Sequence, residues 1–298
     1  MISGRLNTDS GDVGIIQIGL GLIGRAIDRE LEPHILGRKT RSLDWSNIDE
    51  MTSQIRTTLK DLQDLSHITV IWSAGKAGFA ATQKEVDAEL KTFIALAQAL
   101  KQSSAGHEME FWLMSSAGGL HEGQICVSDG ANVKPQRPYG WLKLQQEKTI
   151  QSLYDRNVIC RISSVYTIDN LSGRLGLVAV LMINGIRHKV TTLVGSESTL
   201  RDYILDRDIA KGICYGIRRG QVRGGIHYLI SGTPMSIKMI KSEIEQIIMK
   251  KLYLKYAADQ SNAASITFLK SLRSPLIKHT SLSSNIKHLY NTIVSHQI

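Results

Sequence analysis

The pattern of apolar and polar positions predicts strands that alternate with helices along most of the chain. Short apolar runs typical of buried strands cover residues 13–18, 67–72, 110–114, 157–162 and 225–231. Apolar residues at helical spacing predict helices over residues 25–31, 84–100 and 236–256, and residues 50–65 are polar but compatible with a helix. The alternation predicts an α/β fold, a Rossmann-like doubly wound parallel sheet that binds ligands at the carboxyl ends of its strands.

A glycine-rich turn directly follows the first predicted strand. Gly19, Gly21 and Gly24 have G-x-G-x-x-G spacing, with Leu22 and Ile23 inside the motif, and a helical pattern follows. In this context the glycines let the backbone turn tightly and let a diphosphate reach the free N–H groups of the helix. We expect these residues to bind a dinucleotide cofactor, and the alternative is a turn that only packs the helix on the strand.

The stretch expected to form the second strand is basic. Residues 34–41 contain Arg38, Lys39 and Arg41 but no acidic residue. In NAD sites an acidic side chain about 20 residues after the glycines holds the adenosine ribose. A basic cluster suits the additional 2′-phosphate of NADP(H), so the sequence favours NADP(H), with NAD(H) possible. The alternative is that these bases face solvent.

Small and hydroxyl-bearing residues follow two further strands. Ser73, Ala74 and Gly75 come after the strand at 67–72 and are expected to contact the cofactor, and Ser115 and Ser116 come after the strand at 110–114. A serine at such a position can hydrogen-bond a substrate carbonyl and polarise it, or it can simply cap the next turn.

Tyr139 and Lys143 form a candidate acid/base pair. Of the nine tyrosines, only Tyr139 is followed by a lysine at the fourth position, and this spacing puts both side chains on one face of a helix. A nearby cation favours the phenolate form of a tyrosine, so a phenol placed in this way can give up or take a proton. The alternative is a chance pair on a solvated helix.

Charge and cysteine content narrow the function classes. The net charge of +9 comes entirely from residues 166–298, which carry 18 basic and 8 acidic side chains, whereas residues 1–165 carry 18 and 19. The lysine and arginine residues are scattered without an aromatic stripe, so a small anionic ligand such as a nucleotide diphosphate is favoured over nucleic acid or a membrane surface.

The three cysteines, Cys126, Cys160 and Cys214, have neither zinc-like spacing nor a disulfide framework, so no metal site is expected. The polar residues 1–12 and the absence of a long apolar run lead us to expect a cytoplasmic protein.

The combination of motifs resembles the short-chain dehydrogenase/reductase superfamily, and within it the extended branch of NAD-dependent epimerases and dehydratases that act on nucleotide sugars. The glycine turn, the Ser115-Ser116 strand end and the Tyr139-x-x-x-Lys143 pair carry the general resemblance. Residues 161–166 (R-I-S-S-V-Y) and 201–210 (R-D-Y-I-L-D-R-D-I-A) resemble two segments specific to the extended branch. The resemblance covers about residues 13–235.

Several roles are implied by this resemblance. Tyr139 would be the acid/base, Lys143 would support it and hold the nicotinamide ribose, and Ser116, or else Ser115, would bond the substrate oxygen. Arg201 would contact the diphosphate of the sugar nucleotide, unless it makes a structural salt bridge. His121, in the loop after Ser116, is a candidate second proton donor to the sugar, although loop histidines are more often solvated.

The resemblance also implies a domain division. Residues 13–168, completed by about 201–232, would form the dinucleotide-binding domain, and residues 169–200 and 233–298 would form a smaller, mostly helical substrate-binding lobe. Homodimers are common in the family, so a homodimer is expected. Ser164 and Thr167 stand where the branch usually has asparagine and glycine, and the acidic pair of the 4,6-dehydratases is absent, which argues against a dehydratase.

The sequence is compatible with three hypotheses for the function. The first is an NADP-dependent reductase of a keto nucleotide sugar, a nucleoside-diphosphate 4-keto-6-deoxyhexose, in the synthesis of surface polysaccharide precursors. The second is a nucleotide-sugar epimerase that keeps its NAD(P) bound and uses the same residues. The third is a non-catalytic NADP-binding regulator that kept the fold and lost the chemistry.

Overall fold

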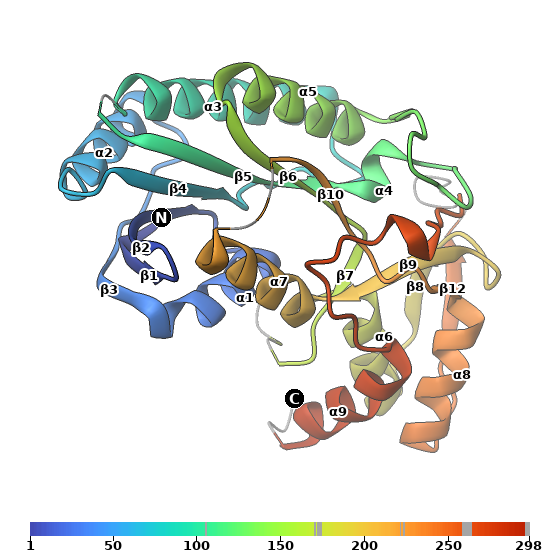
Figure 1. Cartoon of the computed structure of the whole chain (residues 1–298). Helices are drawn as coiled ribbons and strands as arrows, with labels where there is room; N and C mark the ends of the chain where they lie inside the picture. Colours follow the sequence, from blue (N-terminus) through green and yellow to red (C-terminus); the bar gives the residue numbers. More distant parts are fainter. Residues whose placement is uncertain are drawn as a thin grey trace.

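The computed structural model describes residues 1–104, 106–169, 171, 175–220, 222, 224–257 and 264–295. Its central feature is a seven-stranded sheet with the strand order β10-β6-β5-β4-β2-β1-β3 (Figure 1). The strands are β1 (Ile2–Thr8), β2 (Gly11–Ile18), β3 (Ile35–Thr40), β4 (His67–Trp72), β5 (Glu108–Ser116), β6 (Arg156–Ile162) and β10 (Gly225–Leu229). The pairs β2–β4, β4–β5, β5–β6 and β6–β10 are parallel, which confirms the predicted α/β sheet.

Helices cover both faces of this sheet. On one face lie α2 (Ile48–Lys60), α3 (Gln83–Gln102) and α5 (Pro138–Leu153), and on the other lie α1 (Leu22–Leu31) and α7 (Asp206–Arg219) (Figure 1). Each helix layer buries its own apolar cluster against the sheet, one around Phe93 and Phe111 and the other around Trp112 and Ile213. The two clusters explain why the central strands read as nearly continuous apolar runs, since both of their faces are covered.

The first strand is an addition that the sequence pattern did not predict. Strands β1 and β2 form an antiparallel hairpin in which Thr8 pairs with Gly11, and β1 pairs antiparallel with β3 on its other side. Strand β1 therefore lies between β2 and β3, the strand that carries the basic cluster. In the usual dinucleotide-binding order the corresponding strands are neighbours. The pattern gave no signal because only Ile2 and Leu6 are large apolar residues in this strand.

The second part of the chain builds a smaller lobe around its own apolar cluster. The lobe contains two short sheets, with the strand orders β11-β9-β7 and β12-β8, and three helices (Figure 1). Its elements are β7 (Ser164–Tyr166), α6 (Leu177–Ile186), β8 (Thr191–Val194), β9 (Leu200–Leu205), β11 (Pro234–Ser236), α8 (Ile237–Ile248), β12 (Leu254–Ala257) and α9 (Leu282–Ser295). Strand β9 thus pairs outside the large sheet, although α7 and β10, which follow it, belong to the large domain.

The segment after α8 differs from the helical pattern expected for residues 236–256. Helix α8 ends at Ile248 because Met249 adopts a left-handed conformation, and the chain turns back as strand β12. After β12, residues 264–269 run as an extended strap that bonds to Val127 on one side and to Leu200 on the other. The strap therefore joins the two parts of the molecule.

Asp206 makes the stability of the fold depend on pH. Its side chain is fully buried at the start of α7, and burial raises its pKa from 3.8 to about 6. A raised folded-state pKa means that the stabilisation is present below about pH 4 and is lost as the pH rises towards 6. The two-unit difference corresponds to about 3 kcal/mol.

We expect Asp206→Asn to flatten this dependence, because asparagine keeps an acceptor for the backbone N–H of Arg207 and cannot ionise. Urea unfolding of both proteins at pH 4.5, 5.5 and 7 gives the difference in the free energy of unfolding between the variant and the wild type at each pH. A difference that stays constant across this range would contradict the prediction.

Candidate active site

The glycine turn and the end of β4 pack tightly against each other. Gly19 has a φ of +100°, and a Cβ on it would lie 2.3 Å from the amide nitrogen of Ala74, so no other residue fits. Ser73 fixes this contact, because its backbone N–H donates to the Ile18 carbonyl and its hydroxyl donates to the Gly19 carbonyl at 2.8 Å. By contrast, a Cβ on Gly21 would meet no atom within 4 Å. The turn therefore leaves open space beside Gly21, where a dinucleotide could approach the start of α1.

A cleft runs along the carboxyl ends of β2, β4, β5 and β6. It has two compartments, with volumes of about 470 and 740 Å³, and both are lined by Gly21 and by the loop after β4. The residues shared by both are Gly21, Ser73, Ala74, Gly75, Ala77, Gly78 and Phe79. The structure thus brings the predicted cofactor-binding residues of the glycine turn and of the β4 end together around one cleft.

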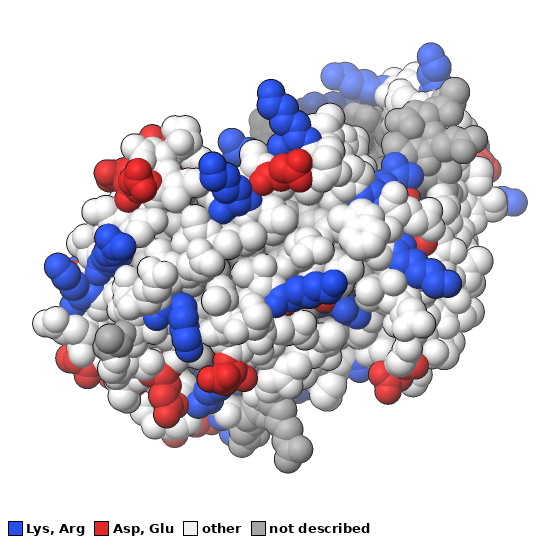
Figure 2. All heavy atoms as spheres, turned by 90° about the horizontal axis from the view of Figure 1, so that it is seen from above, with Lys and Arg blue, Asp and Glu red and all other residues white. Residues whose placement is uncertain are grey.

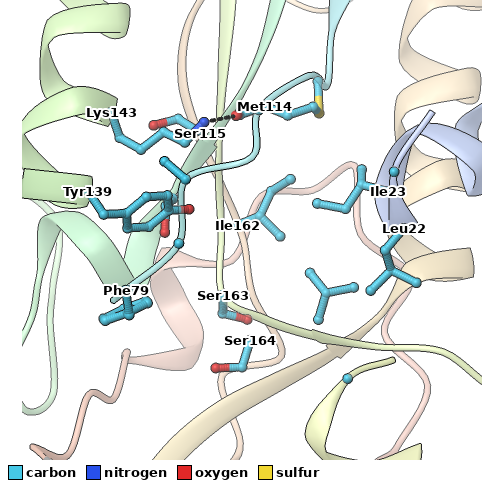
Figure 3. Close-up of a pocket in the computed structure, with 18 of the residues that line it drawn as sticks. Leu22, Ile23, Phe79, Met114, Ser115, Tyr139, Lys143, Ile162, Ser163 and Ser164 are labelled. Carbon is cyan, nitrogen blue, oxygen red and sulfur yellow. Dashed lines mark hydrogen bonds between the residues drawn. The ribbon is translucent and has the colours of Figure 1, made fainter. Parts of the chain in front are cut away.

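Tyr139 and Lys143 both line the smaller compartment. Pro138 starts α5, and the two side chains project from the same face of this helix, while Leu22 and Ile23 face them from the start of α1 (Figure 3). The Lys143 ammonium lies 5.9 Å from the centre of the Tyr139 ring. It is buried and donates to the Gln146 side-chain oxygen at 3.0 Å and to the Met114 carbonyl at 3.4 Å.

A glycine contact sets the distance between α5 and the segment after β5. A Cβ on Gly140 would lie 2.2 Å from the Gly119 carbonyl oxygen, so only glycine lets the first turn of α5 approach this closely. The contact places the Tyr139 ring against Gly119 and near the Ser116 hydroxyl. Tyr139 and Ser116 therefore face the same space, as an acid/base and a carbonyl-binding hydroxyl would require.

The two serines have different partners. The Ser115 hydroxyl donates to the buried Glu147 carboxylate at 2.5 Å. The Ser116 oxygen accepts the Gly119 N–H at 3.0 Å as the N-cap of the short helix α4 (Ala117–Leu120). Its own hydrogen has no acceptor among the described residues, so it is available for donation. This arrangement favours Ser116 over Ser115 as the hydroxyl available to a substrate.

A buried polar chain continues behind the serines and contains His121. Glu147 accepts two hydrogen bonds from Arg161, whose guanidinium also donates to the Tyr228 hydroxyl at 2.7 Å. The Tyr228 oxygen lies 2.7 Å from Nε2 of His121. His121 has no exposed surface and lines neither compartment, and burial lowers its pKa, which favours the neutral ring. The structure therefore places His121 behind the site, not beside a sugar.

Arg201, on β9, also lines the smaller compartment. Its side chain is mostly buried and donates to the carbonyls of Leu200 and Ala264. The adjacent Asp202 joins the two parts of the molecule, since its carboxylate accepts from the hydroxyls of Ser163 and Ser231 and from the Gly232 N–H. Asp202 thus fixes the strand that carries Arg201 to the ends of β6 and β10.

An apolar wall faces the Tyr139 ring and was not predicted. Phe79 lies with its ring centre 5.5 Å from that of Tyr139, and it belongs to a cluster that includes Ile266 and Phe268 of the strap. All three line the smaller compartment. The sequence pattern gave no signal for Ile266 and Phe268, because they come from a polar, serine-rich stretch that only the folded chain brings to the cleft.

The basic cluster of β3 does not face the cleft. One guanidinium nitrogen of Arg38, Nη2, donates to both carboxylate oxygens of Asp28 at 2.9 and 3.0 Å, and Lys39 and Arg41 both pair with Asp61. Because β1 separates β3 from β2, these bases are not next to the glycine turn, as the sequence had led us to expect. They are absent from the lining of both compartments among the described residues.

The excess positive charge also lies elsewhere. Among the described residues, Lys143 and Arg201 are the only lysines or arginines that line the smaller compartment, and Lys76 is the only one that lines the larger. On the face shown in Figure 2 the basic side chains are scattered and interspersed with acidic ones. The described part of the chain contains no group of three or more potential metal ligands and no helix long and apolar enough to span a membrane.

Comparison with known proteins decides the family. The sequence profile of the NAD-dependent epimerase/dehydratase family matches residues 17–231, a segment that contains the glycine turn, Tyr139 and Lys143. The chain belongs to this family. As a family member it is an enzyme of the extended short-chain dehydrogenase/reductase type, an oxidoreductase-type family that uses a nicotinamide dinucleotide. A search of curated protein sequences found no significant match.

Solved structures of nucleotide-sugar enzymes share the fold over nearly the whole chain. UDP-glucose 4-epimerase of Thermotoga maritima, solved with UDP-glucose, has a TM-score of 0.75 at 17% identity and covers 96% of this chain and 99% of its own. MoeE5, in complex with UDP-glucose and NAD, has a TM-score of 0.76 at 17% identity and covers 97% of this chain and 100% of its own. UDP-glucuronic acid 4-epimerase of Bacillus cereus, with UDP-glucuronic acid and NAD, has a TM-score of 0.70 at 21% identity and covers 95% of this chain and 91% of its own.

Proposed function

We propose that this epimerase/dehydratase family member is a nicotinamide-dependent reductase of a keto nucleotide sugar, a nucleoside-diphosphate-linked 4-keto-6-deoxyhexose. Its product would be a precursor for surface polysaccharide. The observation that carries the proposal is the convergence of Tyr139, Lys143 and Ser116 on one compartment beside the glycine turn.

Each side chain has a distinct task in the proposed reaction. A bound reduced nicotinamide would supply the hydride for the keto carbon. The Tyr139 hydroxyl gives its proton to the carbonyl oxygen, and Ser116 donates a hydrogen bond to the same oxygen, which stabilises the charge that develops there. The ammonium of Lys143, on the same face of α5 as Tyr139, favours the phenolate left after proton transfer.

The other residues that line the smaller compartment support a deoxysugar linked to a diphosphate as the substrate. The guanidinium of Arg201 suits a diphosphate because its donors are arranged as a fork. Phe79, Ile266 and Phe268 form an apolar wall beside Tyr139 that would accept the C6 methyl group of a 6-deoxyhexose more readily than a hydroxymethyl group.

An epimerase is the second candidate, because several of the similar structures are named nucleotide-sugar 4-epimerases. It would use the same acid/base and return the hydride to the other face of the sugar. A cofactor-binding regulator without activity is the third, and the free donor of Ser116 beside Tyr139 argues against it.

A substrate panel distinguishes the three candidates. The purified protein is incubated with UDP-, dTDP- and GDP-linked hexoses and 4-keto-6-deoxyhexoses, with and without NADPH or NADH. We expect stoichiometric loss of the nicotinamide absorbance with a 4-keto-6-deoxyhexose. Isomer formation without net loss of absorbance would support the epimerase, and no turnover of any sugar despite cofactor binding would support the regulator.

The preference for NADP(H) stays a prediction. To hold a 2′-phosphate, Arg38 and Lys39 would have to leave Asp28 and Asp61, whereas Lys76 already lines the larger compartment. Titration with both reduced cofactors measures the preference: we expect NADPH to bind about 10-fold more tightly, as one added charge-assisted contact would give. Clearly tighter binding of NADH would contradict this expectation.

We further propose that the protein is a cytoplasmic homodimer. The cytoplasmic assignment agrees with the absence, among the described residues, of a helix that could span a membrane. Sedimentation at micromolar concentration tests the dimer, and a mass of 33.0 kDa would show a monomer instead.

A further inference from the structure

The larger compartment of the cleft lies on the far side of the shared lining from Tyr139. It is lined by the glycine turn, the loop after β4, the first half of α3 and Trp45. If the nicotinamide sits beside Tyr139, as the proposed function requires, a dinucleotide that crosses the glycine turn at Gly21 extends into this compartment with its adenosine half.

The basic cluster of β3 and the acidic residues of the compartment are poorly placed to hold this half, and among the described residues Lys76 is the one basic side chain that lines it. Strand β1 moves β3 away from the glycine turn by one strand spacing, about 4.8 Å, and Arg38 and Lys39 are both paired with acids. The carboxylates that line the compartment are also engaged with the backbone: Glu85 accepts from the Thr82 N–H, and Glu89 accepts from two N–H groups of the loop after β4. Neither carboxylate is positioned as a ribose-binding acid at the end of a second strand.

Three aromatic residues line this compartment among the described residues, Trp45, Trp72 and Phe79, and of these only Trp45 is exposed. It lies in a turn in which the Asp44 carboxylate accepts from both the N–H and the hydroxyl of Ser46, and the Asn47 N–H donates to the Asp44 carbonyl. The indole packs edge-on against Trp72, with ring centres 6.2 Å apart and an interplanar angle of 88°. Trp72 is itself buried and bonded to the Ala74 carbonyl.

This setting holds the ring in place but leaves it accessible. The Trp45 side chain is 40% exposed and lines the compartment, whereas Trp72 is 2% exposed. A fixed, partly exposed indole can stack on a flat heteroaromatic ring at little cost in side-chain entropy, because its turn and its packing partner already restrict it.

We propose that Trp45 stacks on the adenine of the cofactor, and that this contact, not the basic cluster of β3, anchors the adenosine half. Stacking on a base does not depend on the substituent at the ribose 2′ position. Trp45 should therefore strengthen the binding of NADH and NADPH by the same factor, and any preference between them must come from another group.

Binding measurements with fragments of the cofactor test this proposal independently of activity. Calorimetric titration uses NADH, NADPH and ADP-ribose, which lacks the nicotinamide. We expect Trp45→Ala to raise the Kd of all three by about 10- to 100-fold, the range that base–aromatic stacking gives. Trp45→Phe keeps an aromatic face and should stay within about 5-fold of the wild type.

Tyr215→Ala is the matched control, because Tyr215 is an exposed aromatic residue (56%) on α7 that lines neither compartment. It should leave all three Kd values unchanged. The double variant Arg38→Ala/Lys39→Ala should change the Kd of NADPH by less than about 3-fold, because these bases make no cofactor contact and their exposed ion pairs add little stability.

Two results would overturn the inference: unchanged ADP-ribose binding by a folded Trp45→Ala protein, or a selective loss of NADPH binding in the Arg38/Lys39 double variant. Thermal melts establish that each variant is folded. The inference rests on the proposed cofactor chemistry, and the two fail differently: a wild-type protein that binds none of the three ligands contradicts the proposed function, whereas normal binding by Trp45→Ala contradicts only the role of Trp45.

Discussion

Tyr139→Phe should reduce turnover by about 10³-fold while cofactor binding changes little. Phenylalanine keeps the ring that packs against Phe79 and Gly119, so the cavity and the start of α5 are preserved. Only the hydroxyl is lost, and with it the proton that the keto oxygen needs. Steady-state turnover of the substrate identified by the panel, together with the Kd of the reduced cofactor, measures both effects.

Tyr154→Phe provides the matched control. Tyr154 is the buried C-cap residue of α5, it donates its hydroxyl to the Ala97 carbonyl at 2.7 Å, and it lines neither compartment. Its substitution should cost about 1–2 kcal/mol of stability and leave turnover nearly unchanged. If Tyr139→Phe retains turnover, or if both variants lose it equally, Tyr139 is not the acid/base.

Glu147→Gln should lower the free energy of unfolding by about 3 kcal/mol or more. Glu147 is 2% exposed and accepts from Ser115 and from two nitrogens of Arg161, which is 9% exposed. The amide cannot neutralise the guanidinium, so a buried charge would lose its partner. Urea unfolding at pH 7 measures the loss.

Two further variants separate the buried pair from a general effect of charge removal. Glu108→Gln removes an exposed ion pair with Arg156 and should cost less than about 0.5 kcal/mol. Glu147→Gln/Arg161→Met removes both buried charges and should recover part of the stability lost in the single variant. A single variant as stable as the wild type would show that the Arg161 charge is satisfied without Glu147.

The large sheet and much of the candidate site were predictable from local patterns. The run at 67–72 is β4 to the residue, and the glycine turn does connect β2 to α1. Such features are predictable because the buried parallel strands and the tight turn each leave a contiguous signature in the sequence. The four-residue spacing of Tyr139 and Lys143 likewise predicts that the two side chains share a helix face, because this depends only on the helical repeat.

Contacts between distant segments were not predictable in this way. The interposed strand β1, with two large apolar residues, has too weak a pattern to be recognised, yet it changes what surrounds the basic cluster. The loop position of His121 suggested access to a sugar, but Tyr228, more than 100 residues later, meets it in a buried site. Ile266 and Phe268 reach the cleft only through strap bonds to residues around 127 and 200.

The sequence by itself indicated the family, the glycine turn and the candidate acid/base pair, because each motif consists of residues that are close together in the chain. Only the tertiary structure decided that Ser115 is hydrogen-bonded to Glu147 while the Ser116 hydroxyl is available to donate. It also decided that Arg38 and Lys39 are ion-paired with Asp28 and Asp61. It also decided that Trp45 stands at the open compartment. The physical reason is that partner choice, burial and the order of strands in a sheet depend on long-range packing, to which no local pattern of residues corresponds.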